Sequence, residues 1–240
     1  MKTAYPKPSA MGGTLIRQVL ALFKAQKFVL PLTQPICIAV SGGVDSMVLA
    51  HLIGRYGRKM ISPDLITLLH FDHQWRPESA TVEKKAVEML ARKLNAGFRS
   101  IQLAVPKKNS SLNLEDHARQ QRNQHYARLT AQEFAYVLTA HHQNDVAETL
   151  FWRFLRGEIF LQQEGICFQN QRVLRPFLQV TKEQLRAYAH SEDVESFEDP
   201  SNLNPQQMRA FLRKKVFPLL ESKFPGFQNS IVKSSRKNQL

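Results

Sequence analysis

The sequence has only two cysteines, Cys37 and Cys167, and they lie far apart along the chain. Two separate cysteines provide neither a disulfide framework nor a zinc site, and they fit a reducing, cytoplasmic compartment. No run of about 18 apolar residues is present, so a membrane span is not expected. The first ten residues hold two prolines and no apolar block, which argues against a signal peptide.

Acidic residues are scarce at both ends of the chain. Residues 1–44 hold five Lys or Arg and no Asp or Glu, and residues 209–240 hold eight and one. Nearly all of the net charge of +13 comes from these two ends. Basic ends of this kind suggest a polyanionic partner such as nucleic acid, although solvated basic tails would give the same count.

Short apolar runs alternate with helical patterns over most of the chain. With 240 residues, 43% of them apolar, the chain can bury a substantial core. The predicted strands are 36–40, 65–69, 98–103 and 135–139, with a hairpin at 169–171; the predicted helices are 14–27, 47–56, 80–94, 114–132, 145–156, 182–190 and 206–222. This order predicts an α/β fold, a doubly wound parallel sheet of Rossmann-like type. We place that domain at residues 1–175 and a small helical, basic C-terminal extension at residues 176–240.

A glycine-rich loop joins the first predicted strand to its helix. In order, it consists of Ser41, Gly42, Gly43, Val44, Asp45 and Ser46. Ligands of open parallel sheets bind beyond the carboxyl ends of the strands, and peptide N–H groups at a helix start can bind phosphate there. Asp45 would repel phosphate unless a cation lay between them, so we expect Mg²⁺ to bridge Asp45 and the phosphates. A tight Gly-Gly turn without a ligand is the alternative.

The loop is neither a Walker A motif, which requires Gly-Lys-Ser/Thr, nor Gly-x-Gly-x-x-Gly. The pattern Ser-Gly-Gly-x-Asp-Ser resembles the loop of the N-type ATP pyrophosphatases, the PP-loop superfamily. That resemblance implies an enzyme that cleaves ATP between the α and β phosphates and transfers AMP to a substrate oxygen. The six loop residues are therefore expected to bind ATP.

Three further polar motifs start at predicted strand ends or helix starts, where loops converge on the expected ATP site. They are His70-Phe71-Asp72-His73-Gln74-Trp75-Arg76, Asn113-Leu114-Glu115 followed by Arg119 and Arg122, and His141-His142-Gln143-Asn144-Asp145-Val146-Ala147-Glu148. Their order and spacing resemble the tRNA(Ile)-lysidine synthetase family. Residues 175–177, 198–202 and 209–220 resemble it as well.

The resemblance implies a ligase that modifies the wobble cytidine of an isoleucine tRNA with a CAU anticodon. The cytosine C2 oxygen attacks the α-phosphate of ATP, pyrophosphate leaves, and free L-lysine then displaces AMP at C2. The resemblance also implies ATP and Mg²⁺ as cofactors, and it leaves the oligomeric state open, with a homodimer as one option. The catalytic residues that it implies are Asp45, Arg119, His141 and Asp145.

The residue types suit this chemistry. A lysine amine, with a pKa near ~10.4, is mostly protonated at neutral pH and must be held and deprotonated. Asp145 and Glu148 are three residues apart on one helical face and can pair with the ammonium. His141 can relay the proton, and Arg119 or Arg122 can neutralise the α-phosphate.

Further contacts are assigned along the same motifs. His70 is expected to bind ATP. The lysine or cytidine substrate is expected to contact Asp72, His73, Arg76, Glu115, Asp145 and Glu148. The tRNA is expected to contact Arg209, Arg213, Lys214 and Lys215.

Several of these residues also have plainer interpretations. His141 and His142 with Asp145 could form a metal site, although a further ligand at suitable spacing is not evident. Glu148 could simply pair with Arg153, and Arg119 and Arg122 could be solvated helix residues. Core packing is the expected role of Cys37, Phe151, Trp152 and Phe154.

The sequence departs from the pattern of the family at several positions. They include Asn144 in place of Asp, Val146 in place of Gln, Asn123 in place of Tyr, and Ala210-Phe211 in place of Asn-Arg. These departures favour a second interpretation, a degenerate paralogue that binds tRNA or nucleotide without turnover. A third interpretation is a tRNA thiolase of the same superfamily. Such enzymes usually need cysteines for sulfur relay or an iron–sulfur cluster, and this sequence has no Cys-x-x-Cys motif.

Overall fold

The computed structural model describes residues 8–31, 33–74, 77–105, 114–158, 165–197 and 208–237. At its centre is a six-stranded sheet with the strand order β3-β2-β1-β4-β6-β5. Neighbouring strands are parallel except at the edge, where β5 is antiparallel to β6, so the predicted hairpin is confirmed. The strands are β1 (Ile36–Ala39), β2 (Ile66–Asp72), β3 (Gly97–Gln102), β4 (Val137–Leu138), β5 (Gln169–Asn170) and β6 (Val173–Leu174).

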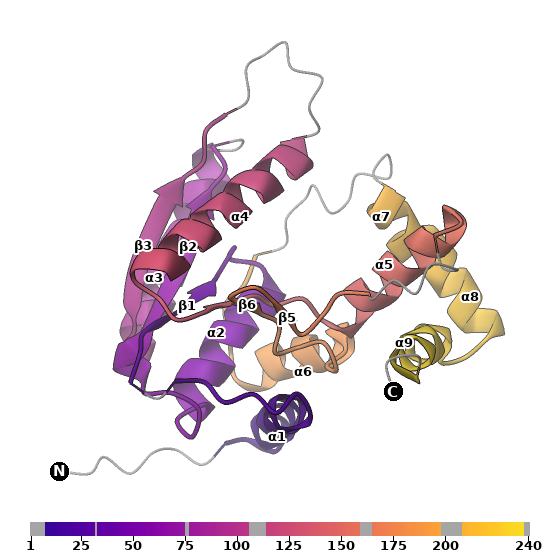
Figure 1. Cartoon of the computed structure of the whole chain (residues 1–240), viewed down its shortest axis with the longest axis horizontal. Helices are drawn as coiled ribbons and strands as arrows, with labels where there is room; N and C mark the ends of the chain where they lie inside the picture. Colours follow the sequence, from indigo (N-terminus) through magenta and orange to yellow (C-terminus); the bar gives the residue numbers. More distant parts are fainter. Residues whose placement is uncertain are drawn as a thin grey trace.

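Helices cover both faces of this sheet (Figure 1). None of those within the described ranges is long and apolar enough to cross a membrane. Two short turns, η1 (Pro63–Leu65) and the π-helical η4 (Leu212–Val216), accompany the α-helices. The α-helices are α1 (Ala10–Ala25), α2 (Val44–Tyr56), α3 (Pro77–Leu94), α4 (Leu114–Gln132), α5 (Gln143–Leu155), α6 (Lys182–Ser191), α7 (Met208–Phe211), α8 (Phe217–Lys223) and α9 (Phe227–Lys237).

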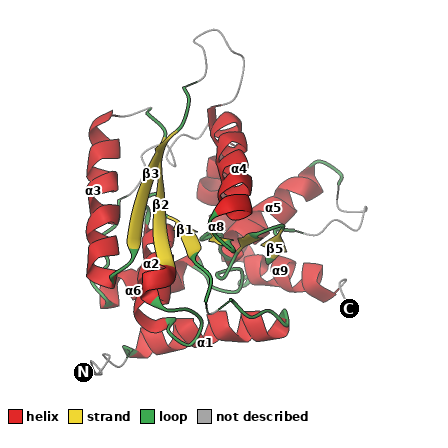
Figure 2. Ribbon diagram, turned by 60° about the vertical axis from the view of Figure 1, so that its left-hand side comes forward, coloured by secondary structure: helices red, strands yellow, loops and turns green. Residues whose placement is uncertain are grey.

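The buried side chains of β1 alternate between two cores, one on each face of the sheet. Ile36 and Ile38 belong to the larger core, to which α1, α2, α3 and α6 contribute, whereas Cys37 belongs to a smaller core covered by α4. All three side chains are 0% exposed. Figure 2 shows α3 and α4 on opposite sides of the sheet. The doubly wound fold and the core position of Cys37 are therefore confirmed.

The strand order reverses at β1, which has β2 on one side and β4 on the other. The chain leaves the carboxyl end of β1 for α2, and it leaves that of β4 for α5. In open α/β sheets a ligand binds at such a switch point, in the crevice outside the strand ends. The loop 41–46 and the motif that starts at His141 both begin at this crevice.

Helix α6 packs on α2 within the larger core. Its start is the predicted capping box, in which Gln184 N–H donates to the Thr181 hydroxyl at 3.3 Å and Thr181 N–H donates to Gln184 Oε1 at 2.9 Å. Farther along the helix, the hydroxyl of the fully buried Tyr188 lies 2.7 Å from Nδ1 of His51 on α2. The division of the chain at residue 175 stays a prediction, although α6 shares its core with α2.

Replacing Tyr188 with phenylalanine is expected to lower the free energy of unfolding by about 1–3 kcal/mol, because the buried His51 would lose its hydrogen-bond partner. Urea unfolding followed by circular dichroism measures this change. The control is Tyr136→Phe, which keeps the edge contact with Phe28 and is expected to change stability by less than about 0.5 kcal/mol. Equal losses in the two variants would contradict a role for the hydrogen bond.

The predicted last helix, residues 206–222, is wrong in its continuity. The described part of it, from residue 208, consists of α7, η4 and α8 in succession. Pro218, in the first turn of α8, has no N–H with which to close an α-turn. The backbone widens just before it, so that Phe217 N–H donates to the carbonyl of Leu212 in a π-turn.

Helix α9 is absent from the predicted elements. It packs on α5, where the rings of Phe227 and Phe151 meet edge to face with centroids 5.6 Å apart. Phe217 from α8 joins them, 5.5 Å from Phe151. The expected core position of Phe154 is wrong, because its side chain is 51% exposed and stacks on Phe151, while Trp152 is half-buried. This aromatic cluster packs α8 and α9 against α5.

Candidate active site

The loop between β1 and α2 is a tight turn held by its own side chains. Gly42 has a φ of +95°, a left-handed conformation that residues other than glycine rarely adopt. A Cβ at this position would also lie only 3.1 Å from the Glu83 side chain. The Ser46 hydroxyl donates to the Gly43 carbonyl at 2.9 Å and accepts the Ser41 N–H at 3.1 Å. The protein itself therefore fixes the shape of this loop.

The start of α2 is open to a ligand. No side chain at the N-cap, Gly43, caps the first turn of α2, so the N–H groups of that turn and the positive end of the helix dipole remain for an anion. Two contacts support the loop from behind: Phe197 N–H donates to the Gly42 carbonyl, and His70 Nδ1 donates to the Val40 carbonyl, both at 3.0 Å. His70 is 2% exposed, and burial lowers its pKa, so it supports the loop as a neutral imidazole.

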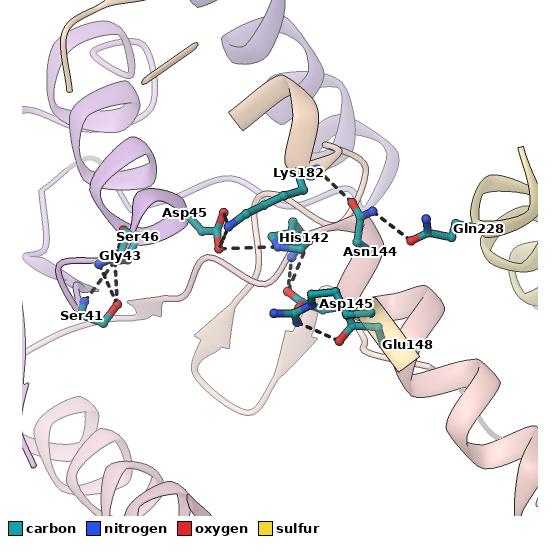
Figure 3. Close-up of polar contacts among 11 residues, drawn as sticks. Ser41, Gly43, Asp45, Ser46, His142, Asn144, Asp145, Glu148, Lys182 and Gln228 are labelled. Atoms are coloured by element: carbon teal, nitrogen blue, oxygen red, sulfur yellow. Dashed lines mark hydrogen bonds and ion pairs between the residues drawn. The ribbon is translucent and has the colours of Figure 1, made fainter. Parts of the chain in front are cut away.

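Six ionisable side chains of alternating charge run from this loop to α5 and η4 (Figure 3). Opposite neighbours stabilise each other, and a change of charge at one member alters the balance at the next. We call this set the charge chain. In order, it consists of Lys182, Asp45, His142, Asp145, Arg213 and Glu148.

Asp45 lies between two cationic groups. Lys182 Nζ is 2.6 and 2.7 Å from its two oxygens, and His142 Nε2 is 3.6 Å from one of them. Burial alone would raise the pKa of Asp45, but His142 and Lys182 outweigh it and lower that pKa. Burial likewise opposes protonation of His142, yet Asp45 and Asp145 raise its pKa. Asp45 is therefore an ionised carboxylate whose counter-charge comes from the protein.

The other half of the charge chain is a carboxylate pair bridged by arginine. Arg213 donates from Nε and Nη2 to the two oxygens of Glu148 at 2.7 and 2.9 Å, and Nη2 is 3.8 Å from Asp145 Oδ1. Burial raises the pKa of Glu148, which is 2% exposed, against the opposing effect of Arg213. The shared helical face of Asp145 and Glu148 is confirmed, and Glu148 pairs with Arg213 rather than with Arg153.

Asn144 uses both ends of its amide to join three helices. Its Oδ1 accepts the backbone N–H of Lys182 at the start of α6 at 2.9 Å, and its Nδ2 donates to Gln228 Oε1 on α9 at 2.9 Å. The departure from the usual Asp therefore has a structural role here. Two other departures, Val146 and Ala210, are buried apolar side chains that are 5% exposed.

A hollow of about 620 Å³ lies between α4, α5 and the β5–β6 hairpin. Its described lining includes Arg119, Arg153, Arg175 and His141, and no Asp or Glu. Desolvation by the surrounding protein atoms, followed by the charges of Arg175 and Arg119, lowers the pKa of His141 to about 4 against the opposing effect of Asp145, although the residue as a whole is exposed to solvent. The hollow therefore combines a neutral imidazole with several guanidinium groups, which suits a phosphate-bearing ligand. Arg119 and His141 do meet at one site, as the sequence predicts.

The remaining predicted site residues are more dispersed. Asp72 ends β2 and His73 follows it. Asp72 Oδ1 accepts the Gln74 N–H at 2.8 Å, and the two residues belong to neither the charge chain nor the hollow. Lys214 and Lys215 are exposed on η4. Outside the described residues lie Arg76, residues 198–202 and the side chains of Glu115 and Arg209.

Magnesium fits this site only together with phosphate. Within the described ranges, no three His, Cys, Asp or Glu residues gather in a way that could hold a metal ion, so the alternative metal site at His141, His142 and Asp145 is not supported. Asp45 offers one carboxylate, 29% exposed, and phosphate oxygens and water would have to complete the octahedron. The ammonium of Lys182 would have to move away from Asp45 for that ion to bind.

Sequence reasoning misses how the charge chain is connected. Lys182 is predicted only as part of a helix, His142 only as an alternative metal ligand, and Arg213 as a tRNA contact. Lys182 and Asp45 are 137 residues apart, so no local pattern relates them. The available signal is positional, because Lys182 directly follows the predicted cap Thr181.

Comparisons with known proteins agree with this geometry. Residues 13–220 match the family described as the PP-loop domain. The tRNA(Ile)-lysidine synthase of Thermus thermophilus is 36% identical over 202 residues, which cover 83% of this chain and 38% of that protein. The enzyme of the same name from Thermotoga maritima is 31% identical over 203 residues, which cover 82% of this chain and 47% of that protein. The chain thus spans less than half the length of these curated relatives.

A solved structure shares the fold. The U34-tRNA thiolase NcsA from Methanococcus maripaludis, with its 4Fe-4S cluster, superposes with a TM-score of 0.75 at 16% identity, over 95% of this chain and 78% of that one. The family match spans most of the present chain and includes the loop 41–46, which we call the phosphate loop. The chain belongs to the PP-loop domain family.

Proposed function

We propose that this protein is an ATP-dependent ligase that adenylates C2 of the wobble cytidine in an isoleucine tRNA with a CAU anticodon. It then joins L-lysine to that carbon and releases AMP and pyrophosphate. The observation that carries the proposal is the convergence of three features at the β1/β4 switch point: the phosphate loop, the charge chain and the cationic hollow. The names of the relatives from Thermus thermophilus and Thermotoga maritima support it. A tRNA substrate would place the reaction in the cytoplasm.

In the proposed adenylation, the loop 41–46 and the start of α2 hold the triphosphate. Mg²⁺ carried in with ATP would be held by Asp45 and would offset charge on the phosphates. Arg119, at the hollow, would neutralise the α-phosphate while the cytosine C2 oxygen attacks it. Pyrophosphate then leaves from the loop, and the cytidine carries AMP on its C2 oxygen.

The hollow is the proposed place for the cytidine. His141 is neutral at pH 7 because its pKa is lowered, so its imidazole can accept a proton from the incoming amine or donate a hydrogen bond to the adenylate. Its Nδ1 lies 3.1 Å from the Thr139 hydroxyl, which orients the ring. Arg153 and Arg175 add positive charge that fits the phosphodiester groups beside the base.

The lysine substrate is proposed to bind beside the carboxylate pair. A free amino acid brings both ammonium and carboxylate groups, and the cluster of Asp145, Glu148 and Arg213 offers charges of both signs. Arg213 is held bidentately by Glu148, yet its side chain is 46% exposed and can also receive a carboxylate. Asp145 can then pair with an ammonium. Arg213 is therefore proposed to bind the lysine substrate rather than the tRNA. Arg209, Lys214 and Lys215 remain proposed tRNA contacts.

The function is tested by the release of labelled pyrophosphate from ATP. Release that requires tRNA, together with lysine incorporation into the tRNA detected by mass spectrometry, is the expected result. Pyrophosphate release without lysine incorporation, but with sulfur incorporation, would favour a tRNA thiolase. Binding of tRNA or ATP without any release would favour a degenerate paralogue, as the departures at Asn123 and Asn144 suggest.

Replacing Arg213 with methionine is expected to raise the KM for lysine at least about 10-fold, because the lysine carboxylate loses a charged hydrogen-bond partner. The KM for ATP should change by less than about twofold. Steady-state kinetics with tRNA at saturation measure both constants. The control is Arg186→Met, an exposed arginine on α6. An unchanged lysine KM with weaker tRNA binding would return Arg213 to the tRNA contacts that the sequence predicts.

A further inference from the structure

Lys182 stands at the phosphate loop but belongs to none of the motifs that the sequence analysis singles out. Its ammonium lies 2.6 and 2.7 Å from the two carboxylate oxygens of Asp45. Figure 3 shows the two side chains pointing toward each other. The two side chains are 24% and 29% exposed, so a ligand arriving from solvent can reach both. A lysine therefore occupies the position next to Asp45 that a ligand cation would need.

The backbone of Lys182 is held at the start of α6, and its side chain extends from there to Asp45. Its N–H donates to Asn144 Oδ1 at 2.9 Å, and the preceding Thr181 caps the helix. Farther along α6, Tyr188 and His51 tie this helix to α2, which carries Asp45. The stem of a lysine has four flexible carbons, so its ammonium can reach a range of positions around a fixed Cα. The position that it occupies in this structure is beside Asp45, in the first turn of α2.

The charges at the phosphate loop favour a movement of the Lys182 ammonium when phosphate binds. The open N–H groups of the first turn of α2 attract phosphate, whereas the Asp45 carboxylate in the same turn repels it. In the free protein, Lys182 cancels the charge of Asp45. When phosphates arrive, an ammonium with three donors can bond to them, and the carboxylate becomes available to a metal ion carried by the nucleotide.

We propose that Lys182 is a pyrophosphate-binding residue, which pairs with Asp45 in the free protein and turns to the β- and γ-phosphates when ATP binds. This inference rests on the proposed ATP site and adds to it a residue with a defined ligand. In the free protein, Lys182 thereby takes the place of the metal ion beside Asp45. When ATP is bound, Lys182 and the metal ion would both contact the phosphates. It also contacts the group that leaves when AMP is transferred.

The test compares three variants for the binding of inorganic pyrophosphate, ATP and AMP by titration calorimetry, in EDTA and in Mg²⁺. For K182M, the affinities for pyrophosphate and ATP are expected to fall at least about 10-fold, as for the loss of a charged hydrogen bond, while that for AMP stays within about twofold. D45N, which frees Lys182 and removes the repulsion, is expected to bind pyrophosphate in EDTA more tightly than the wild type. D45N/K182M should lose the part of that gain that depends on Lys182 and bind pyrophosphate more weakly than D45N.

K182M leaves the Asp45 carboxylate without its partner, which could destabilise the fold. D45N/K182M lacks both charges of this contact, so its comparison with D45N tests the inference even if K182M fails to fold. The matched control is Lys223→Met, an exposed lysine at the end of α8. Pyrophosphate affinities that are equal in D45N and D45N/K182M would overturn the inference and leave the contact as a purely structural ion pair. A Lys182-dependent affinity without any tRNA-dependent pyrophosphate release would instead refute the proposed ligase and leave this inference standing.

Discussion

Replacing Asp45 with alanine is expected to reduce tRNA-dependent pyrophosphate release in Mg²⁺ by about 10²–10³-fold, the range seen when one preorganised electrostatic group is removed. The carboxylate would hold the nucleotide's metal ion, and it is the only group of the phosphate loop that carries a negative charge. Its loss would leave the ammonium of Lys182 without its carboxylate and would remove one of the two acids that raise the pKa of His142. The triphosphate could still bind to the ammonium, but without the metal in its productive position.

The measurement is the initial rate of pyrophosphate release at saturating ATP and tRNA. The control, Asp64→Ala, removes an exposed aspartate near η1 and should leave the rate unchanged. Circular dichroism should show an intact fold in both variants, because Asp45 is partly exposed and contributes little to the core. A wild-type rate for Asp45→Ala would mean that the metal role is assigned to the wrong residue.

Replacing His141 with alanine is expected to lower kcat by about 10²–10⁴-fold, the usual contribution of a positioned acid–base group. The KM for ATP should change little, since the triphosphate is proposed to bind at the loop rather than in the hollow. The pH profile provides a second readout. Because the pKa of His141 is lowered to about 4, its neutral form persists above that pH, and His141 itself should cause no change in rate between about pH 6 and pH 8.

The control for His141 is His190→Ala, an exposed histidine in the last turn of α6. It should leave both kcat and the pH profile as in the wild type. An inflection near pH 6.5 that disappears in His141→Ala would show that His141 titrates in the working range and would contradict its neutral assignment. A loss of activity below tenfold would remove it from the catalytic residues.

The fold is predictable from the sequence wherever the signal is local. The bounds of α4 match the predicted 114–132. The cap at Thr181 and the buried run of β1 are also local patterns, read from adjacent residues. The last helices are predicted less well. A proline within a helical pattern leaves open whether the helix bends, stops or widens, and at Pro218 the outcome depends on the packing of Phe217.

The candidate site divides in the same way. The loop 41–46 and the face shared by Asp145 and Glu148 follow from spacing along one element. The pairing of Arg213 with Glu148 joins η4 to α5, across 65 residues, and depends on how the last helices pack. Local sequence patterns do not indicate which charged residues pair when they are distant in sequence. The sequence can therefore predict the residues of such a network but not which of them contact each other.

The amide of Asn144 has a consequence for the charge on the phosphate loop. A carboxylate at this position could still accept the backbone N–H at the start of α6, but it could not donate to Gln228 on α9. It would also add a negative charge at the helix start that already carries Asp145. With the neutral amide in that place, the extra charge is avoided while the start of α6 stays fixed, and the contact of Lys182 with Asp45 then sets how readily the loop exchanges its own lysine for a nucleotide.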